Sequence, residues 1–329
     1  MTIHAKQSEL VAEGIHIDFR IGGSLFSPKM LRAVSDVSFT LKAGEALAIV
    51  GESGSGKSTV ARALCRVHRP TSGDVVLDGE NILSHPKWSR QRDFAQAVQM
   101  IFQDPFSSLN PVHTIGKQLT EVLLLHKDIS AQEAIKQSVD VLDRVGIPSP
   151  DIRMLEYPHQ LSGGMRQRVV IAIALACKPS LLIADEPTTA LDVTIQAQIL
   201  ELIKELQTEM GMSVILITHD LGVIAEVCQQ VVVMYAGKVA EKGSVFDLFD
   251  NPQHPYTRGL LESIPRLDSI PKSKLNTIEG MVPGLLDLPA GCRFANRCPI
   301  VDEQCKTSPP LIEHVGESHQ VSCFRWQKS

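Results

Sequence analysis

The sequence predicts an α/β fold built around a mostly parallel sheet, and three observations support this prediction. Short apolar runs such as EALAIV (residues 45–50) and SLLIADEP (residues 180–187) have the length and composition of buried strands. Segments with helical spacing of apolar residues follow them, at residues 58–68 and 194–211. A glycine-rich loop, GESGSGKS, joins the first run to its helix. Repeated alternation of strand and helix is typical of a doubly wound sheet.

The composition is that of an ordinary globular protein. The chain has 329 residues, of which 43% are hydrophobic and 21% charged. This length suits one large domain with an appendage, or two domains. The formal net charge of -5 provides no basic field that could hold nucleic acid by its phosphates, which argues against a DNA- or RNA-binding protein.

The longest uninterrupted apolar run, VVIAIALAC at residues 169–177, lies between Arg168 and Lys178. A membrane-spanning helix needs about 20 apolar residues, so we expect no span in this chain. The N-terminal sequence lacks the apolar stretch of a signal peptide. We therefore expect a cytoplasmic location, where a reducing environment makes disulfides a poor explanation for the cysteines.

Two segments depart from simple alternation before residue 165. Residues 73–83, GDVVLDGENIL, predict an antiparallel hairpin with Asp78 and Gly79 at its turn. Residues 88–165 read as a helical insertion, in which residues 114–128 and 130–147 are amphipathic.

Strand and helix alternate again after this insertion, ending with an expected helix at residues 221–228 and one expected strand at residues 229–241. Prolines become frequent from Asn251 onward and predict an irregular tail. We therefore expect a first domain at residues 1–250 and an extension at residues 251–329.

The loop GESGSGKS matches the pattern G-x-x-x-x-G-K-[ST] of a phosphate-binding loop. Its glycines allow backbone amides to converge on phosphates, Lys57 places a charge on the β- and γ-phosphates, and the Ser58 hydroxyl can ligate Mg²⁺. A flexible glycine turn is the alternative, but it does not explain the position of the motif between an apolar strand and a helix. We therefore predict nucleotide contacts from Gly51, Glu52, Ser53, Gly54, Ser55, Gly56, Lys57, Ser58 and Thr59.

Two acids, Asp185 and Glu186, end the apolar strand in SLLIADEP. A carboxylate at a strand end can hold Mg²⁺ together with the loop hydroxyl, and the next carboxylate can orient and deprotonate the attacking water. Alone this pair is weak, because strands often end in solvated acids. Combined with the phosphate loop, it predicts that Ser58 and Asp185 bind Mg²⁺ and that Glu186 is the catalytic base.

A third motif, YPHQLSGGMRQR at residues 157–168, resembles the signature of ATP-binding cassette (ABC) proteins. Companion motifs are also present, with Gln103 in VQMIFQDP, Asp192 at the end of TTALD and His219 in LITHD. The resemblance covers residues 10–250. It implies a P-loop ABC-type nucleotide-binding domain, with a parallel sheet core, an antiparallel β subdomain and a helical insertion.

The resemblance also implies a pair of cassettes. In this family two cassettes associate head to tail, so that the phosphate loop of one and the LSGG of the other enclose each ATP. Glycine amides at a helix start suit a phosphate for the same reason as the phosphate loop does. The partner's ATP would then be contacted by Ser162, Gly163, Gly164, Gln167 and Asp192. Because Glu186 is present, the resemblance implies a hydrolysing subunit.

Three further residues receive roles from the same resemblance. Gln103 would contact Mg²⁺ and the attacking water, and would connect the site to the helical insertion. His219 would contact the γ-phosphate, although a histidine at a strand end, taken alone, is more often a surface residue. Phe19, in GIHIDF, is the candidate for stacking on adenine; it also fits a strand core position, and Phe26 lies close by in the sequence.

The segments NPQHPYTRGLLESIPRL (residues 251–267) and QDPFSSLNP (residues 103–111) resemble ATPase subunits of the dipeptide, oligopeptide and nickel importers. The prolines also fit a rigid linker. The resemblance implies a peripheral ATPase on the cytoplasmic face of the inner membrane. Its partners would be a second ATPase, with a different chain favoured over an identical one, two permease subunits and an external solute-binding protein, and no nucleic acid.

Two other functions stay open at this point. The first is the ATPase of an importer for nickel or another small solute, because the cargo of such a system never touches its ATPase. The second is an ABC ATPase outside transport that uses its cysteines as a sensor. Family members that act on ribosomes or DNA usually carry two cassettes or a long coiled-coil insertion, and this sequence has neither.

Four of the seven cysteines follow residue 290: Cys292, Cys298, Cys305 and Cys323. Their spacing contains no C-x₂-C pair of the kind usual in zinc ribbons. Four soft thiolates on an irregular scaffold suit an iron–sulfur cluster or Zn²⁺. In some of the importer relatives that this tail resembles, four such cysteines hold a [4Fe–4S] cluster, which implies a structural cluster here; free thiols are the remaining alternative. The other three cysteines lie in apolar helical segments and are expected in the core: Cys65, Cys177 and Cys228.

Overall fold

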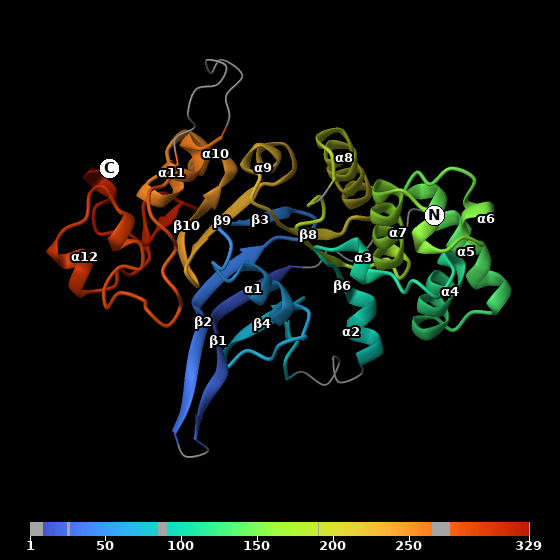
Figure 1. Cartoon of the computed structure of the whole chain (residues 1–329), viewed down its shortest axis with the longest axis horizontal. Helices are drawn as coiled ribbons and strands as arrows, with labels where there is room; N and C mark the ends of the chain where they lie inside the picture. Colours follow the sequence, from blue (N-terminus) through green and yellow to red (C-terminus); the bar gives the residue numbers. More distant parts are fainter. Residues whose placement is uncertain (1–8, 25–26, 85–90, 190, 265–276, 329) are drawn as a thin grey trace. The chain divides into compact units, whose positions relative to one another are not determined.

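The computed structural model describes residues 9–24, 27–84, 91–189, 191–264 and 277–328 (Figure 1). Phe26, Ala190 of the TTALD motif and part of the proline-rich segment after Ile264 lie outside the described residues. The chain divides into two compact units. One contains Lys42–Glu45 and Val76–Ile217, and the other contains Val11–Leu41, Ala46–Val75 and the described residues from Thr218 onward.

The first unit has three parallel strands. β6 (Val98–Ile101) pairs with β7 (Leu181–Asp185), and β7 pairs with β8 (Ser213–Ile217). Every residue of β7 and β8 is buried, which is the pattern of a parallel sheet covered on both faces. The predicted parallel pairing is therefore confirmed in this unit. β6 lies inside the segment expected to be helical. The sequence did not predict this strand, because four residues are too few to show a strand pattern.

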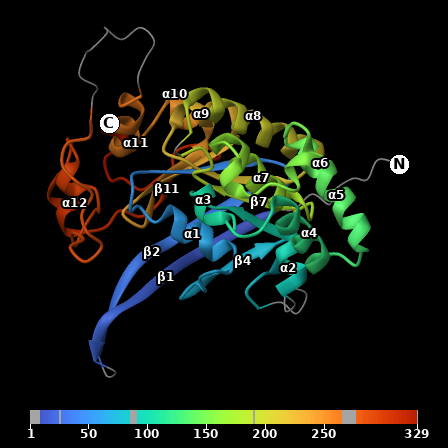
Figure 2. The same cartoon turned by 45° about the vertical axis from the view of Figure 1, so that its right-hand side comes forward.

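Helices make up most of the remainder of this unit. Thr114 and Ser130 accept hydrogen bonds from backbone N–H groups of the first turn and cap α4 and α5, which lie within the two segments predicted to be amphipathic helices. Figures 1 and 2 both show these two helices next to each other. The helices are α2 (Gln91–Ala97), α3 (Pro105–Ser108), α4 (Ile115–His126), α5 (Ala131–Arg144), α6 (Pro150–Arg153), α7 (Gly163–Leu175) and α8 (Val193–Met210).

The second unit contains the strand that leads into the glycine-rich loop. β3 (Ala46–Val50) pairs in parallel with β9 (Gln230–Tyr235), and α1 (Lys57–Leu64) and α9 (Leu221–Val227) belong to the same unit. The prediction of a single strand at residues 229–241 is wrong. β9 reverses into the antiparallel β10 (Lys238–Ser244), because Ala236 and Gly237 both adopt positive φ angles, of 44° and 85°.

Two long strands of this unit, β1 (Leu10–Ser24) and β2 (Ser27–Leu41), run side by side in both views (Figures 1 and 2). The predicted hairpin is also present, with β4 (Ser72–Leu77) turning into the antiparallel β5 (Glu80–Asn81); its paired residues belong to the first unit. Asp78 and Gly79 form its turn with φ angles of 56° and 77°. These values match the two-residue turn that an Asp-Gly pair favours.

The C-terminal part is more regular than the prolines predicted. β12 pairs antiparallel with β10, so that Val321 lies opposite Glu241, and β11 pairs with β12. An added strand receives its backbone partners from the sheet edge, which the local sequence does not reveal. The elements are α10 (Val245–Asp250), α11 (Pro255–Glu262), α12 (Glu303–Thr307), β11 (Glu313–His314) and β12 (Gln320–Val321), with 3₁₀ turns at Ala295–Arg297 and Trp326–Lys328.

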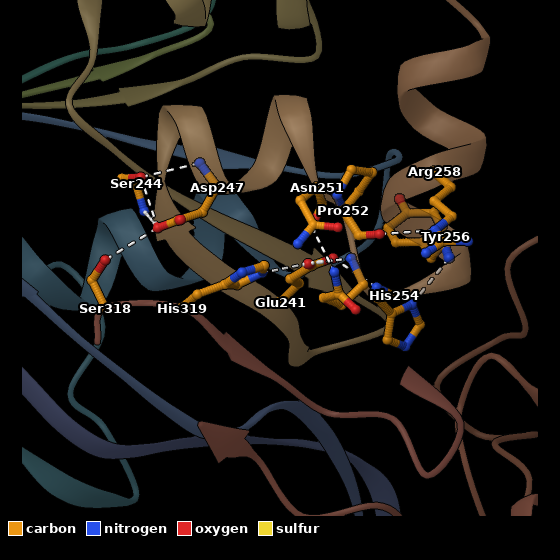
Figure 3. A network of polar contacts seen from close by, with 11 residues as sticks. Glu241, Ser244, Asp247, Asn251, Pro252, His254, Tyr256, Arg258, Ser318 and His319 are labelled. Carbon is orange, nitrogen blue, oxygen red and sulfur yellow. Dashed lines mark hydrogen bonds and ion pairs between the residues drawn. The ribbon is translucent and has the colours of Figure 1, made fainter. Parts of the chain in front are cut away.

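A buried carboxylate holds these pieces together (Figure 3). The Glu241 side chain on β10 is fully buried. It accepts hydrogen bonds from the backbone N–H groups of Gln253 and His254, at 2.6 and 2.9 Å, and lies 2.7 Å from the ring Nε2 of His319. One carboxylate therefore joins β10, the start of α11 and the residue before β12. Burial alone would raise the pKa of Glu241, but these hydrogen bonds outweigh it and lower the pKa.

His254 has a second part in this junction. Burial lowers its pKa to about 4, so the ring is neutral at physiological pH. The ring Nδ1 accepts the Tyr256 N–H at 3.0 Å and thereby caps α11. The HPY sequence, which reads as a proline-rich linker, is thus a helix start built around a neutral histidine.

Among the described residues, no helix combines the length and the apolar character that a membrane crossing requires.

We predict that Glu241→Ala lowers the free energy of unfolding by about 3 kcal/mol, because two buried N–H groups lose their acceptor. Urea unfolding of the purified chain measures the change. The stabilisation is present above the carboxyl pKa of the unfolded chain and is lost as the pH falls through the lowered folded pKa. The exposed Glu262 on α11 is the matched control, and Glu262→Ala should change stability by less than about 0.5 kcal/mol. Equal effects of the two variants would contradict the proposed importance of Glu241.

Candidate functional site

The glycine-rich loop follows β3 directly and adopts a backbone that only glycine tolerates. Gly51 has a φ of 143°, and a Cβ atom there would lie 2.1 Å from the backbone oxygen of Met234 on β9. Gly54 and Gly56 also have positive φ angles, of 79° and 99°. Only glycine meets these conditions at low cost, so the sequence pattern reflects backbone geometry and not a flexible turn.

Lys57, the first residue of α1, is buried and folds back over the loop. Its Nζ donates to the carbonyl oxygens of Gly51 and Glu52, at 2.7 and 3.1 Å. Ser55 Oγ is buried and has no hydrogen-bond partner in the part of the chain that the structure describes. The N-cap residue of α1 is Gly56, which has no side chain to cap the helix. A cation, an unpartnered hydroxyl and an uncapped helix start together fit a bound phosphate group.

The first unit brings Gln103 and Glu186 together. Both follow neighbouring parallel strands, β6 and β7, whose carboxyl ends lie at one edge. The Gln103 Nε2 donates to Glu186 Oε2 at 2.8 Å, and the Thr189 Oγ1 donates to the same oxygen at 2.9 Å. Asp185, the last residue of β7, is buried. The Glu186 carboxylate therefore has a fixed orientation next to the end of the strand.

The signature motif lies beside Asp192, the last residue of TTALD, in the same unit. Ser162 caps α7 by accepting from the Met165 N–H, and Asp192 caps α8 by accepting from the Ile195 N–H. A Cβ atom at Gly164 would lie only 3.0 Å from a methyl group of Ile195. The start of α7 thus packs closely against the start of α8. Gly163 is the first residue of α7, and Gln167 is buried within it.

His219 and Phe19 belong to the second unit. His219 is exposed and follows Thr218, whose N–H donates to the Ile49 oxygen on β3 at 3.4 Å. His219 therefore lies near the end of the strand that leads into the phosphate loop. Phe19 is half-buried on β1, and its ring packs edge-on against the His68 ring at 5.3 Å. This contact neither requires nor excludes a stacked adenine.

The four C-terminal cysteines, Cys292, Cys298, Cys305 and Cys323, are free thiols that line one small cavity. Burial raises the pKa of each thiol, that of Cys323 to about 11. A cation bound there would have to displace the thiol protons. In the described residues, no group of three or more His, Cys, Asp or Glu side chains is arranged to hold a metal ion. Thiolates are suitable ligands for a soft metal, but the positions of these four side chains do not support the expected metal site.

The other three cysteines were predicted to lie in the core, and two of them do. Cys177 and Cys228 are buried, and Cys65 at the end of α1 is half-buried. Burial raises the pKa of Cys228 to about 12, which makes it an unreactive thiol.

Sequence reasoning did not identify three residues that contact the candidate site. Thr189 lies within TTALD but was given no role, although it shares the Glu186 oxygen with Gln103. Tyr256 and Arg297, which are far along the chain, contact Glu52 in the phosphate loop. A hydroxyl three residues after a strand-end acid is a usable local signal for Thr189, whereas no local pattern identifies a partner some 200 residues away.

Comparisons with protein families match both parts of the chain. Residues 34–189 match the ABC transporter family, and residues 240–305 match the family described as the oligopeptide/dipeptide transporter C-terminal region.

Among similar proteins, the oligopeptide transport ATP-binding protein OppD of Escherichia coli is 52% identical over 296 residues, covering 89% of this chain and 87% of that protein. OppD of Salmonella typhimurium is 51% identical, with coverage of 89% and 88%. A Brucella abortus protein named as a peptide import ATP-binding protein is 47% identical over 339 residues, covering 98% of this chain and 99% of its own length.

Among solved structures, a dimeric post-hydrolysis state of the ATP-binding cassette MJ0796 bound to ADP and Pi has a TM-score of 0.64 and 27% identity, covering 72% of this chain and 98% of that one. CbiO1 of Clostridium perfringens, part of an ABC transporter complex, has a TM-score of 0.62 and 28% identity, with coverage of 75% and 92%. Fold, sequence and motif order agree, and the chain belongs to the ABC ATPases of the peptide-importer ATP-binding protein family.

Proposed function

We propose that this chain is the ATP-hydrolysing subunit of an ABC importer for di- or oligopeptides. The observation that carries the proposal is the presence of both family matches in one chain that is 52% identical to OppD over 296 residues. A general ABC cassette would explain only the first match. The second match includes the HPY segment, which the Glu241 carboxylate fixes to β10.

The roles proposed for the site follow from the chemistry of the residues. The loop amides and the start of α1 hold the phosphates, and Lys57 neutralises their charge. Glu186 orients and deprotonates the attacking water, with its carboxylate held by Gln103 and Thr189. Mg²⁺, when bound, supplies Lewis-acid stabilisation of the phosphates. The remaining proposed roles are Mg²⁺ ligation by Ser58, Gln103 and Asp185, γ-phosphate contact by His219, adenine stacking by Phe19, and contact with the partner's ATP by Ser162, Gly163, Gly164, Gln167 and Asp192.

The importer would comprise a second ATPase subunit, two permeases and an external solute-binding protein. The chain would act at the cytoplasmic face of the membrane and would not bind nucleic acid. A sister ATPase is favoured over an identical copy, and the dimeric state of the similar cassette MJ0796 supports pairing as such. Residues 1–250 are proposed as the ATPase domain, with its helical part at about residues 88–165, and residues 251–329 as the importer-specific extension.

We predict that Glu186→Gln lowers the ATPase rate at least about 100-fold while ATP still binds, because the amide cannot accept the proton of water. Phosphate release and equilibrium ATP binding measure the two effects. Glu205→Gln makes the same chemical change on the exposed face of α8 and should leave both unchanged. A Glu186→Gln enzyme that turns over at the wild-type rate would refute the catalytic assignment.

The cargo and the partners are tested by purification from membranes. An affinity-tagged chain expressed in its own host cells should bring permease subunits and a second ATPase with it, and membranes containing the complex should take up labelled short peptides in the presence of ATP. Uptake of nickel instead of peptides would assign the alternative cargo. Recovery of the chain without any membrane protein would reject the transport function.

We further propose that Cys292, Cys298, Cys305 and Cys323 bind a [4Fe–4S] cluster with a structural role, Zn²⁺ being the alternative. The donor set of four thiolates supports this proposal. The four side chains line one small cavity, but among the described residues they are not arranged as a preformed metal site. A small segment with little apolar surface gains stability from a bound metal centre.

We predict that protein purified without oxygen contains about four irons and matching sulfide per chain and shows a broad absorption band from thiolate-bound iron. Iron, sulfide and zinc assays on one sample check this. Replacement of Cys305 by Ser should remove the metal, whereas Cys228→Ser, which alters a buried thiol elsewhere, should not. Freshly purified protein without metal would leave the four thiols free and refute the proposal.

A further inference from the structure

Arg297 lies between two of the C-terminal cysteines and is almost fully buried, with 3% of its side chain exposed. Its guanidinium forms five hydrogen bonds. Two of them reach the carboxylate of Glu52, at 2.6 and 3.0 Å. The others reach the carbonyl oxygens of Ile278 and Glu279, at 3.1 and 2.9 Å, and the Tyr235 hydroxyl at 3.4 Å. All five N–H groups of an arginine are therefore matched, which fixes its position.

Glu52 is the second residue of the phosphate loop, and both its side chain and its backbone form hydrogen bonds with distant residues. Its carboxylate forms the bidentate ion pair with Arg297, and its backbone N–H donates to the Tyr256 hydroxyl at 2.8 Å. Tyr256 is fully buried, and its ring packs against those of Tyr235 and Phe294, at 4.7 and 5.5 Å. A pair of parallel charge-assisted hydrogen bonds fixes orientation as well as distance.

The backbone of Glu52 connects its contacts with Arg297 and Tyr256 to the residues that would bind phosphate. Its carbonyl oxygen accepts from the Ser55 N–H at 3.2 Å and from the Lys57 Nζ at 3.1 Å. A displacement of Glu52 would therefore move the acceptor that positions both groups. Since phosphate binding requires amides that converge before the ligand arrives, the position of Glu52 bears on affinity and not only on stability.

Loss of either charge would not be neutral. Arg297 without Glu52 is a buried cation that lacks its counter-ion, and the structure then favours exposing it to water. Arg297 is the last residue of the 3₁₀ turn at Ala295–Arg297, which leads into Cys298, so exposing the arginine would disturb this turn. The order of the loop and the order of the C-terminal segment, residues 277–328, are thus linked through one ion pair.

We propose that Arg297 is a positioning residue of the nucleotide site, which fixes the phosphate loop through Glu52 and makes ATP affinity depend on the folded C-terminal segment. The proposal rests on the nucleotide site assigned under the proposed function and is independent of any metal at the cysteines. Coupling is reciprocal, so bound ATP stabilises the segment by the same factor by which the segment strengthens ATP binding.

The experiment is equilibrium ATP binding to the purified full chain, in a Glu186→Gln background that prevents turnover. Arg297→Ala and Glu52→Ala should each weaken ATP binding on the order of 10-fold. The double variant should bind no more weakly than either single one, because both remove the same pair. Arg297→Lys should lie between wild type and Arg297→Ala, because lysine keeps the charge but cannot form the bidentate contact.

A matched control separates positioning from general damage to the C-terminal part. Arg258 on α11 donates to the Pro252 oxygen at 2.8 Å, and Arg258→Ala should leave ATP affinity unchanged. A second readout is kinetic: with Glu186 intact, Arg297→Ala should raise KM for ATP more than it lowers kcat.

Wild-type affinity in both Arg297→Ala and Glu52→Ala would overturn the proposal, as would an equal loss in Arg258→Ala. If Arg297→Ala does not fold, Glu52→Ala decides the question, because Glu52 is 31% exposed and its truncation leaves no large cavity. Lys57→Ala tests the nucleotide site itself, because unchanged ATP binding in this variant would reject the site. If Lys57→Ala loses ATP binding while Arg297→Ala and Glu52→Ala keep it, only the positioning role of Arg297 is rejected.

Discussion

The phosphate loop must hold its backbone N–H groups toward one small volume, and the contacts around it in its own unit follow from that requirement. Gly51 passes so close to Met234 that no side chain fits. β9 therefore has to pair with β3 in one register, in which Val50 lies opposite Val233. The turn after β9 adds a second restraint, because the Gly237 N–H donates to the Ser55 oxygen at 2.9 Å. The loop is thus shaped by its neighbours as much as by its own glycines.

The Glu186 carboxylate depends on a different restraint. Glu186 has a φ of 48°, which costs a residue with a side chain on the order of 1–2 kcal/mol. Its backbone N–H donates to the Ile217 oxygen at the end of β8, and its carboxylate accepts from Gln103 and Thr189. Residues in such conformations persist when the surrounding structure determines them fully. The strand ends and these two side chains hold the carboxylate in one orientation.

Two buried charges determine how the C-terminal part contacts the rest of its unit. Glu241 accepts hydrogen bonds from the start of α11 and contacts His319, and Arg297 donates to Glu52 in the phosphate loop. A buried charge without its partner is strongly unfavourable, so partial docking of this part is unfavourable as well. Buried ion pairs of this kind favour one arrangement of the C-terminal part over others more than they raise the free energy of unfolding. The ordered position of Glu52 is the functional consequence of this arrangement.

The sequence alone determined the cassette fold and most of the local geometry of the site. The glycine pattern, the two amphipathic segments at residues 114–128 and 130–147 and the hairpin turn at Asp78 are local signals, because each depends on a few adjacent residues. The motifs place Gln103 and Glu186 after two strands of the sheet, and the structure brings the two side chains into contact, since parallel strands end at one edge of a sheet.

Only the tertiary structure decided the remaining points. The strand expected at residues 229–241 proved to be two strands, and the tail expected to be irregular pairs with β10. The partners of the Glu241 and Glu52 carboxylates come from residues 12 to 245 positions away. Burial and ion pairing at such separations depend on how the chain is folded, and no local pattern of residue types records them.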